Sequence, residues 1–212
     1  MEPKIILLLL ADLLLLLSTL IYGVKFLRKG NVLLGLEWLV VTVSTSNLLV
    51  YLLTEAQAAY SISFFLDAFS RGFGIPIIAT AGLMAVTHRY KPSTRTDVLW
   101  FVGAFSGTFV LVGADFVARA LPYFYLLMWT GFSIYLGYFA WRLWRAGEGF
   151  HAAAVGLALV TSQAIATIYD FYRIPGDEDQ VIFLILALTT WAYLTVATYH
   201  AYCALERAEK QA

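Results

Sequence analysis

Long runs of apolar residues, separated by short polar joints, make up most of the chain. A helix needs about 20 such residues to cross the roughly 30 Å hydrocarbon core of a bilayer, and every run comes near that length. We therefore predict an all-α integral membrane protein with seven transmembrane helices in a single domain, residues 1–212. The predicted helices cover residues 5–24, 32–53, 61–87, 98–117, 122–143, 152–172 and 181–204.

Composition supports this interpretation and narrows the function. Only 13% of the residues are charged, whereas a soluble domain carries about 25%. The formal net charge is zero, which argues against a nucleic-acid partner. No joint is long enough for a soluble domain, so we expect the chain to act within the lipid bilayer of a plasma membrane, most naturally a bacterial inner membrane. The sequence does not identify a protein partner.

The distribution of basic residues predicts the orientation. Lys and Arg in short loops favour the cytoplasmic side. The joints after the first, third and fifth predicted helices, together with the C-terminal tail, hold ten of the fourteen basic residues, and the opposite side is acidic around residues 177–179. We therefore expect the N-terminus outside and the C-terminus in the cytoplasm. The ten are Lys25, Arg28, Lys29, Arg89, Lys91, Arg95, Arg142, Arg145, Arg207 and Lys210.

An internal repeat is a further prediction. The basic segment 25–30, KFLRKG, resembles segment 142–147, RLWRAG. The resemblance favours two parallel three-helix units, residues 5–90 and 122–205, joined by the linker helix 98–117. The alternative is that apolar helices with polar ends look alike by chance.

The stretch 67–76 carries the strongest candidate site. Asp67 and Arg71 are charges inside an apolar segment, and each costs about 2.5–3.5 kcal/mol at the centre of a bilayer. Their spacing of four residues places them on one helical face. Gly72, Gly74 and Pro76 follow and weaken the helical hydrogen-bond ladder, which predicts a hinge or a close approach. The alternative is an ion pair that only fixes packing.

Other polar and aromatic residues are expected to converge on the same site. The amides and the carboxylate among them would supply hydrogen-bond or ion partners, and the two tryptophans would supply apolar walls. Ordinary interhelical hydrogen bonds and core packing are the alternatives. Asp170 looks like the weakest polar candidate, because its neighbours are typical of a membrane interface. The predicted site partners are Asn47, Gln163, Asp115, Trp129 and Trp191.

Two further acids lie within predicted helices. Asp12 stands alone near the centre of the first, which fits either a proton-coupling site or an acid that hydrogen-bonds a neighbouring helix. Glu37 lies one turn from the cytoplasmic end of the second, and we expect it to pair with a loop cation in a structural role.

These features favour a protein that binds, and transports, a small polar or amphipathic solute in the outer half of the bundle. The alternative is a non-transporting sensor or assembly subunit whose polar core fixes helix packing. We predict no catalytic, metal or cofactor site, which disfavours an enzyme without excluding one. The architecture is similar to that of microbial rhodopsins, but residues 181–204 lack the lysine that retinal would need. It is also similar to sugar and vitamin-precursor transporters, without the Pro-Gln pair of their repeats.

Overall fold

The computed structural model of the chain describes residues 2–211, and throughout this range it contains helices and no strands. The helices are α1 Pro3–Arg28, α2 Val32–Thr54, α3 Gln57–Phe69, η1 Ser70–Ala79, α4 Thr80–Thr87, α5 Thr94–Gly113, η2 Asp115–Val117, α6 Leu121–Arg145, α7 Gly149–Tyr169 and α8 Val181–Gln211. Three of them, α3, η1 and α4, follow one another without a break and form one long helix, Gln57–Thr87.

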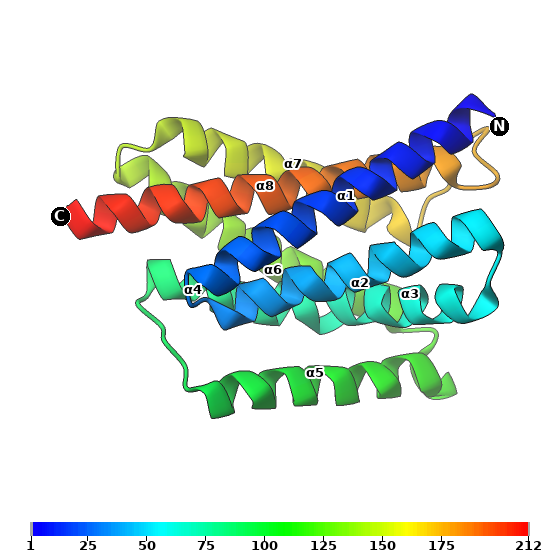
Figure 1. Cartoon of the computed structure of the whole chain (residues 1–212), viewed down its shortest axis with the longest axis horizontal. Coiled ribbons are helices and arrows are strands. Elements are labelled where there is room, and N and C mark those ends of the chain that lie inside the picture. Colours follow the sequence, from blue (N-terminus) through cyan, green and yellow to red (C-terminus); the bar gives the residue numbers. More distant parts are fainter. Residues whose placement is uncertain (1, 212) are drawn as a thin grey trace.

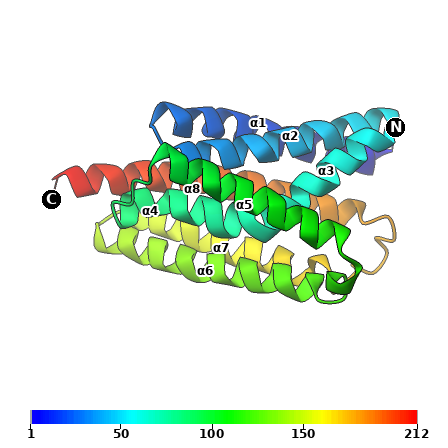
Figure 2. The ribbon, with the colours of Figure 1, turned by 90° about the horizontal axis from the view of Figure 1, so that it is seen from below.

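The helices run back and forth along one axis, so that the two ends of the chain lie at opposite ends of the bundle (Figure 1). Six of them form a closed ring, because α1 packs on α2 and α8, α7 packs on α8 and α6, and η1 packs on both α6 and α2. The remaining helix, α5, lies outside the ring and packs mainly on α3 and η1 (Figure 2).

The exterior is as apolar as a bilayer requires. Of the seven long helices in the described residues, six are long and apolar enough to cross a membrane, which indicates a helical membrane protein. Large aliphatic side chains are exposed on the outer faces of the helices, such as Leu7 and Leu10 on α1 and Leu127 and Ile134 on α6. A water-soluble surface would not carry so many. The one long helix of the described residues that is not apolar enough to count among these six is α6, which is rich in tyrosine and tryptophan.

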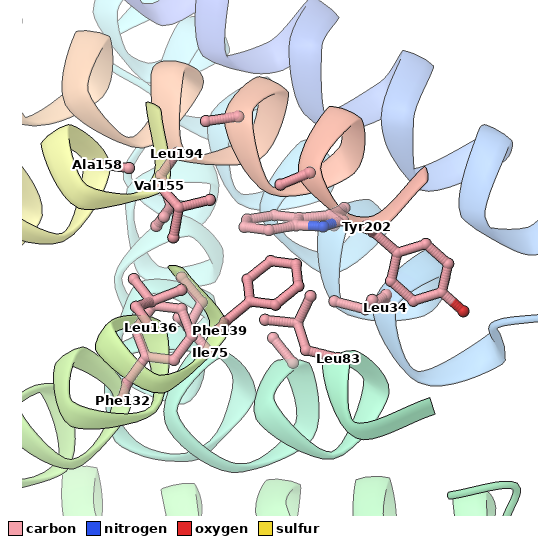
Figure 3. Packing of buried hydrophobic residues seen from close by; sticks show 14 of the residues in the cluster. Leu34, Ile75, Leu83, Phe132, Leu136, Phe139, Val155, Ala158, Leu194 and Tyr202 are labelled. Carbon is pink, nitrogen blue, oxygen red and sulfur yellow. The ribbon is translucent and has the colours of Figure 1, made fainter. Parts of the chain in front are cut away.

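The interior is closely packed between α6, α7, α8, η1 and the start of α2. Leu136, Phe139, Val155 and Leu194 are completely buried, and they belong to one cluster with Leu34 from α2, which lies on the other side of Phe139 in Figure 3. Because lipid is as apolar as these side chains, their contribution comes mainly from close contact and not from removal of water. This core holds the ring together at mid-height.

A tight turn connects α1 to α2. Gly30 adopts a φ of 75°, which glycine tolerates without steric cost. Asn31 then caps α2, because its Oδ1 accepts a hydrogen bond from the backbone N–H of Leu34 (3.1 Å). Its Nδ2 donates to the carbonyl oxygen of Gly82 (2.8 Å). The first two helices are therefore fixed to α4 at this end of the bundle.

The segment η1 is a ten-residue π-helix. π-Helices are rare and often lie at functional sites. Pro76 within it has no N–H to donate, and Gly72 and Gly74 weaken the helical preference before it. The backbone therefore departs from α-helical geometry where these three residues lie, and a hinge role for them stays a prediction.

Asp177 holds the loop before α8 and gives a pH-dependent prediction. Its Oδ1 and Oδ2 accept hydrogen bonds from the backbone N–H groups of Ile182 (2.9 Å) and Phe183 (2.8 Å). Burial acts to raise the pKa of the carboxyl, but these bonds outweigh it and lower the pKa below its usual value. A lowered folded-state pKa stabilises the protein above the unfolded value of about 3.9. We expect Tm to fall as pH drops below about 4, and Asp177→Asn, measured by thermal unfolding, to show less of this fall.

Candidate functional site

Arg71 lies at the centre of a charged cluster near the end of the bundle where α6 begins and α7 ends. Its Nε donates to Asp67 Oδ2 at 2.9 Å, and its Nη1 donates to Asp170 Oδ2 at 3.1 Å. The guanidinium side chain is 11% exposed, and the two carboxylate side chains are 26% and 25% exposed. One cation is thus shared between two acids from different helices, and these contacts tie α3 and η1 to the end of α7.

Two tyrosine rings complete the cluster. The guanidinium carbon of Arg71 lies 4.2 Å from the ring centroid of Tyr125 and 4.0 Å from that of Tyr169. The hydroxyl of Tyr169 also donates to Asp67 Oδ2 at 3.4 Å. An arginine over an aromatic face gains about 2 kcal/mol when water is excluded. We call Asp67, Arg71, Tyr125, Tyr169 and Asp170 the Arg71 centre.

A small cavity adjoins the Arg71 centre. Its volume is about 10 Å³, which is room for about one water molecule. Trp129 and Trp191 line it together with Arg71, and their ring centroids are 6.2 Å apart. The indole Nε1–H groups of both tryptophans are buried and have no hydrogen-bond partner within residues 2–211. Unpartnered buried donors are costly, so this cavity suits a hydrogen-bond acceptor.

The structure places the sequence-predicted site residues in two groups. Asp67, Arg71, Trp129 and Trp191 come together at the Arg71 centre and its cavity. Their role in binding a ligand stays a prediction.

The other three predicted partners lie elsewhere. Asn47 donates to the carbonyl of Val43 in its own helix, and Gln163 accepts from Ser133 at 2.7 Å. Asp115 is exposed and lies beyond α5, because that helix ends at Gly113 and not at residue 117 as predicted. None of the three lines the cavity at Arg71. The expected convergence therefore extends to the tryptophans but not to these residues.

Two members of the Arg71 centre, Tyr125 and Tyr169, are not predicted from the sequence, because tyrosines near the ends of apolar helices are typical of a membrane interface. A third member, Asp170, is predicted only as the weakest polar candidate. In the structure α7 ends at Tyr169, and Asp170 is its C-cap. This position directs the acid back towards Arg71 instead of into solvent. The sequence contains one signal for Asp170, because a lone cation in an apolar interior needs counter-charge. Asp170 is a second carboxylate at the same depth in the membrane as the buried Arg71.

Glu37 on α2 places a second polar side chain against the π-helix η1. It is completely buried, and neither carboxylate oxygen has a hydrogen-bond partner among the described residues. The prediction that it pairs with a loop cation is therefore wrong. Its carboxylate lies directly against Gly74, where an added Cβ would stand 2.2 Å from Oε1. The absence of a side chain at Gly74 thus leaves the space that the Glu37 carboxylate of α2 occupies.

Asp12 is also completely buried, and both of its oxygens lack a hydrogen-bond partner in the described structure. A neighbouring helix therefore offers it no bond in this conformation. Thr19, two turns further along α1, donates to the carbonyl of Leu15 and receives a bond from Thr42. A coupling role for Asp12 stays a prediction.

Tyr169 allows the hydrogen bond and the ring contact to be separated. Tyr169→Phe removes the 3.4 Å bond to Asp67 but keeps the ring under Arg71. We expect it to lower the free energy of unfolding by about 0.5–1 kcal/mol. Tyr169→Leu also removes the aromatic face and is expected to lose about 2 kcal/mol. Unfolding of the purified variants in detergent measures both; equal losses would show that the ring contact contributes nothing.

The comparisons with family models, with curated proteins and with solved structures found no match to this chain.

Proposed function

We propose that the protein binds a small polar solute at the Arg71 centre, in the outer half of a seven-span bundle, and passes it across the membrane. In this proposal α6 is the seventh span, because it is a member of the ring and packs between η1 and α7. The N-terminus is outside, as the distribution of basic residues favours. A charged group within a membrane span is usually functional, and this bundle keeps two of them, Asp67 and Arg71, together with Asp170 at the end of α7.

The observation that carries the proposal is a cavity lined by Arg71, by Asp170 and by two tryptophans whose buried indole N–H groups lack hydrogen-bond partners in the described residues. Arg71 supplies a guanidinium, and Trp129 and Trp191 supply indole N–H groups that lack partners. A carboxylate or another small oxyanion has the acceptor oxygens to satisfy all three. We therefore favour a solute that carries such a group.

Exchange of ion-pair partners offers a route for entry. Asp67 is on the same helix as Arg71, four residues away, and stays close to it. Asp170 instead follows the end of α7 and begins the connection to α8. A solute carboxylate can take the place of Asp170 on the guanidinium, so that the charge on Arg71 stays paired throughout. The 10 Å³ cavity is the closed state of such a site, and binding widens it.

The same centre supports a second candidate, a sensor or assembly subunit that transports nothing. The observation in its favour is that Arg71 already has two internal ion pairs and two ring contacts. A centre that is satisfied in this way can serve packing alone. The two candidates differ in whether the cavity ever opens.

Tryptophan fluorescence tests the proposed binding, because Trp129 and Trp191 line the cavity. We expect at least one of acetate, lactate, glycine and formate to change the emission of the purified protein saturably. Arg71→Gln is expected to remove the change, while Arg145→Gln, at an exposed arginine over Trp141, should keep it. A response that persists in Arg71→Gln, or no response to any of the four, contradicts the proposed binding of a small acceptor.

A further inference from the structure

A cavity of about 560 Å³ lies at the opposite end of the bundle from the Arg71 centre. It is bordered by the turn between α1 and α2, by α4 with the loop that follows it, and by the end of α8. In Figure 1 these segments gather at the end where α8 finishes. Nothing in the proposed transport of a solute uses this cavity.

The charged groups in this cavity are not all paired with one another. Glu206 accepts from Lys29 at 2.5 Å and lies 3.6 Å from Lys210. Arg89 and Lys91 also line the cavity, and neither forms an ion pair within residues 2–211. Two cations that line one cavity at the end of a membrane bundle, neither with an ion-pair partner in the described residues, suit a phosphate group.

An apolar groove continues from the cavity along the side of the bundle. Its volume is about 360 Å³, and it runs between the start of α2 and the face of α5 that carries Phe101, Phe105 and Phe109. Val32 and Asp97 line both the groove and the charged cavity. A charged cavity and an apolar groove therefore meet at these two residues, and α5 lies outside the helical ring where lipid reaches it (Figure 2).

Asp97 gives the junction a second chemical preference. It is 8% exposed, and its Oδ1 is buried without a hydrogen-bond partner in the described structure. A buried acceptor of this kind favours a ligand that brings a donor. The ligand therefore has an acyl chain, a phosphate and, next to the phosphate, an N–H or O–H group.

We propose that the cavity and groove together bind one phospholipid from the surrounding bilayer, with a headgroup that carries a hydrogen-bond donor. Its phosphate lies at Arg89 and Lys91, its ammonium or hydroxyl group donates to Asp97, and an acyl chain follows the groove along α5. Phosphatidylethanolamine and phosphatidylglycerol have such donors. Phosphatidylcholine has the same phosphate and chains but no donor, so it binds more weakly.

Native mass spectrometry of the whole protein with each of these three lipids tests the headgroup part. The difference of one hydrogen bond to a charged group corresponds to about tenfold in affinity, so we expect the two donor lipids to bind about that much more tightly than phosphatidylcholine. Asp97→Ala should remove the preference. The double variant Arg89→Gln/Lys91→Gln should weaken all three lipids, whereas Arg28→Gln, an exposed cation outside the cavity, should weaken none.

Filling the groove tests the acyl-chain part. Val102 lines the groove and is 56% exposed, so Val102→Trp adds bulk there without disturbing the core. We expect fewer bound lipids for this variant and no change for Val112→Trp, at an exposed position of the same helix outside the groove. Equal binding of all three lipids by the wild type, or a double variant that binds like Arg28→Gln, would overturn the proposal. If Val102→Trp binds as much lipid as the wild type, the proposal is also overturned.

Discussion

Arg71→Gln is expected to lower the free energy of unfolding by about 3–5 kcal/mol, which is the range for removing one partner of a buried ion pair. The reason is that Asp67 and Asp170 would face each other without the cation that both contact, at 2.9 and 3.1 Å. The faces of Tyr125 and Tyr169 would lose the same cation. Unfolding of the purified protein in detergent, followed by circular dichroism, measures the loss.

Two controls separate charge from shape in this experiment. Arg71→Lys keeps the charge but cannot contact both acids through a planar fork, so an intermediate loss is expected. Arg71→Gln/Asp170→Asn removes one of the acids that the first change leaves unpaired and should recover part of the stability. A stability equal to wild type in Arg71→Gln would mean that the two carboxylates do not depend on this guanidinium.

Gly74→Ala is expected to be clearly destabilising. A Cβ at this position would lie 2.2 Å from Oε1 and 2.4 Å from Oε2 of Glu37, so either the buried carboxylate must shift or α2 and η1 must move apart. Overpacking of this kind typically costs about 1–3 kcal/mol. Thermal unfolding measures it, and Gly131→Ala is the matched control, because nothing lies within 4 Å of a Cβ there. We expect Gly131→Ala to raise the free energy of unfolding by up to about 1 kcal/mol, because alanine favours the helix over glycine.

Shortening the glutamate should relieve the clash. In Gly74→Ala/Glu37→Asp the carboxylate retracts by one methylene group, and we expect part of the lost stability to return. If the double variant is no more stable than Gly74→Ala, the loss comes from the π-helix backbone and not from contact with Glu37.

The sequence predicts the helices well and the centre only in part, for physical reasons. Apolar runs of bilayer length define helices whatever their neighbours, and the described structure is helical throughout, with six candidate spans. The pairing of Asp67 with Arg71 follows from spacing within one helix. The contact with Asp170 depends on where α7 ends and on how the ring closes, 99 residues away in sequence, and no local pattern encodes that.

The surroundings of Glu37 and of Asn47 could not be predicted from the local sequence either. Glu37 is near a helix end by sequence, but the packing of α2 against η1 buries it completely. Asn47 lies near mid-helix, but its amide donates to the carbonyl of Val43 in its own helix and not to a neighbouring helix. Which face of a helix meets a neighbour decides both cases. In an all-round apolar helix, hydrophobic periodicity gives little information about that face.

Water access to the cavity at Arg71 tests the central claim most directly. Ala166 lines this cavity, and Ala158 is a completely buried core residue on the same helix. Each would be changed to cysteine in a Cys203→Ala background, and sealed vesicles would be treated with a membrane-impermeant methanethiosulfonate reagent. We expect Ala166→Cys to react much faster than Ala158→Cys, and faster still when Asp170→Asn removes one ion pair. Equal, negligible reaction at both positions, with and without Asp170→Asn, would show a permanently closed centre and contradict solute binding there.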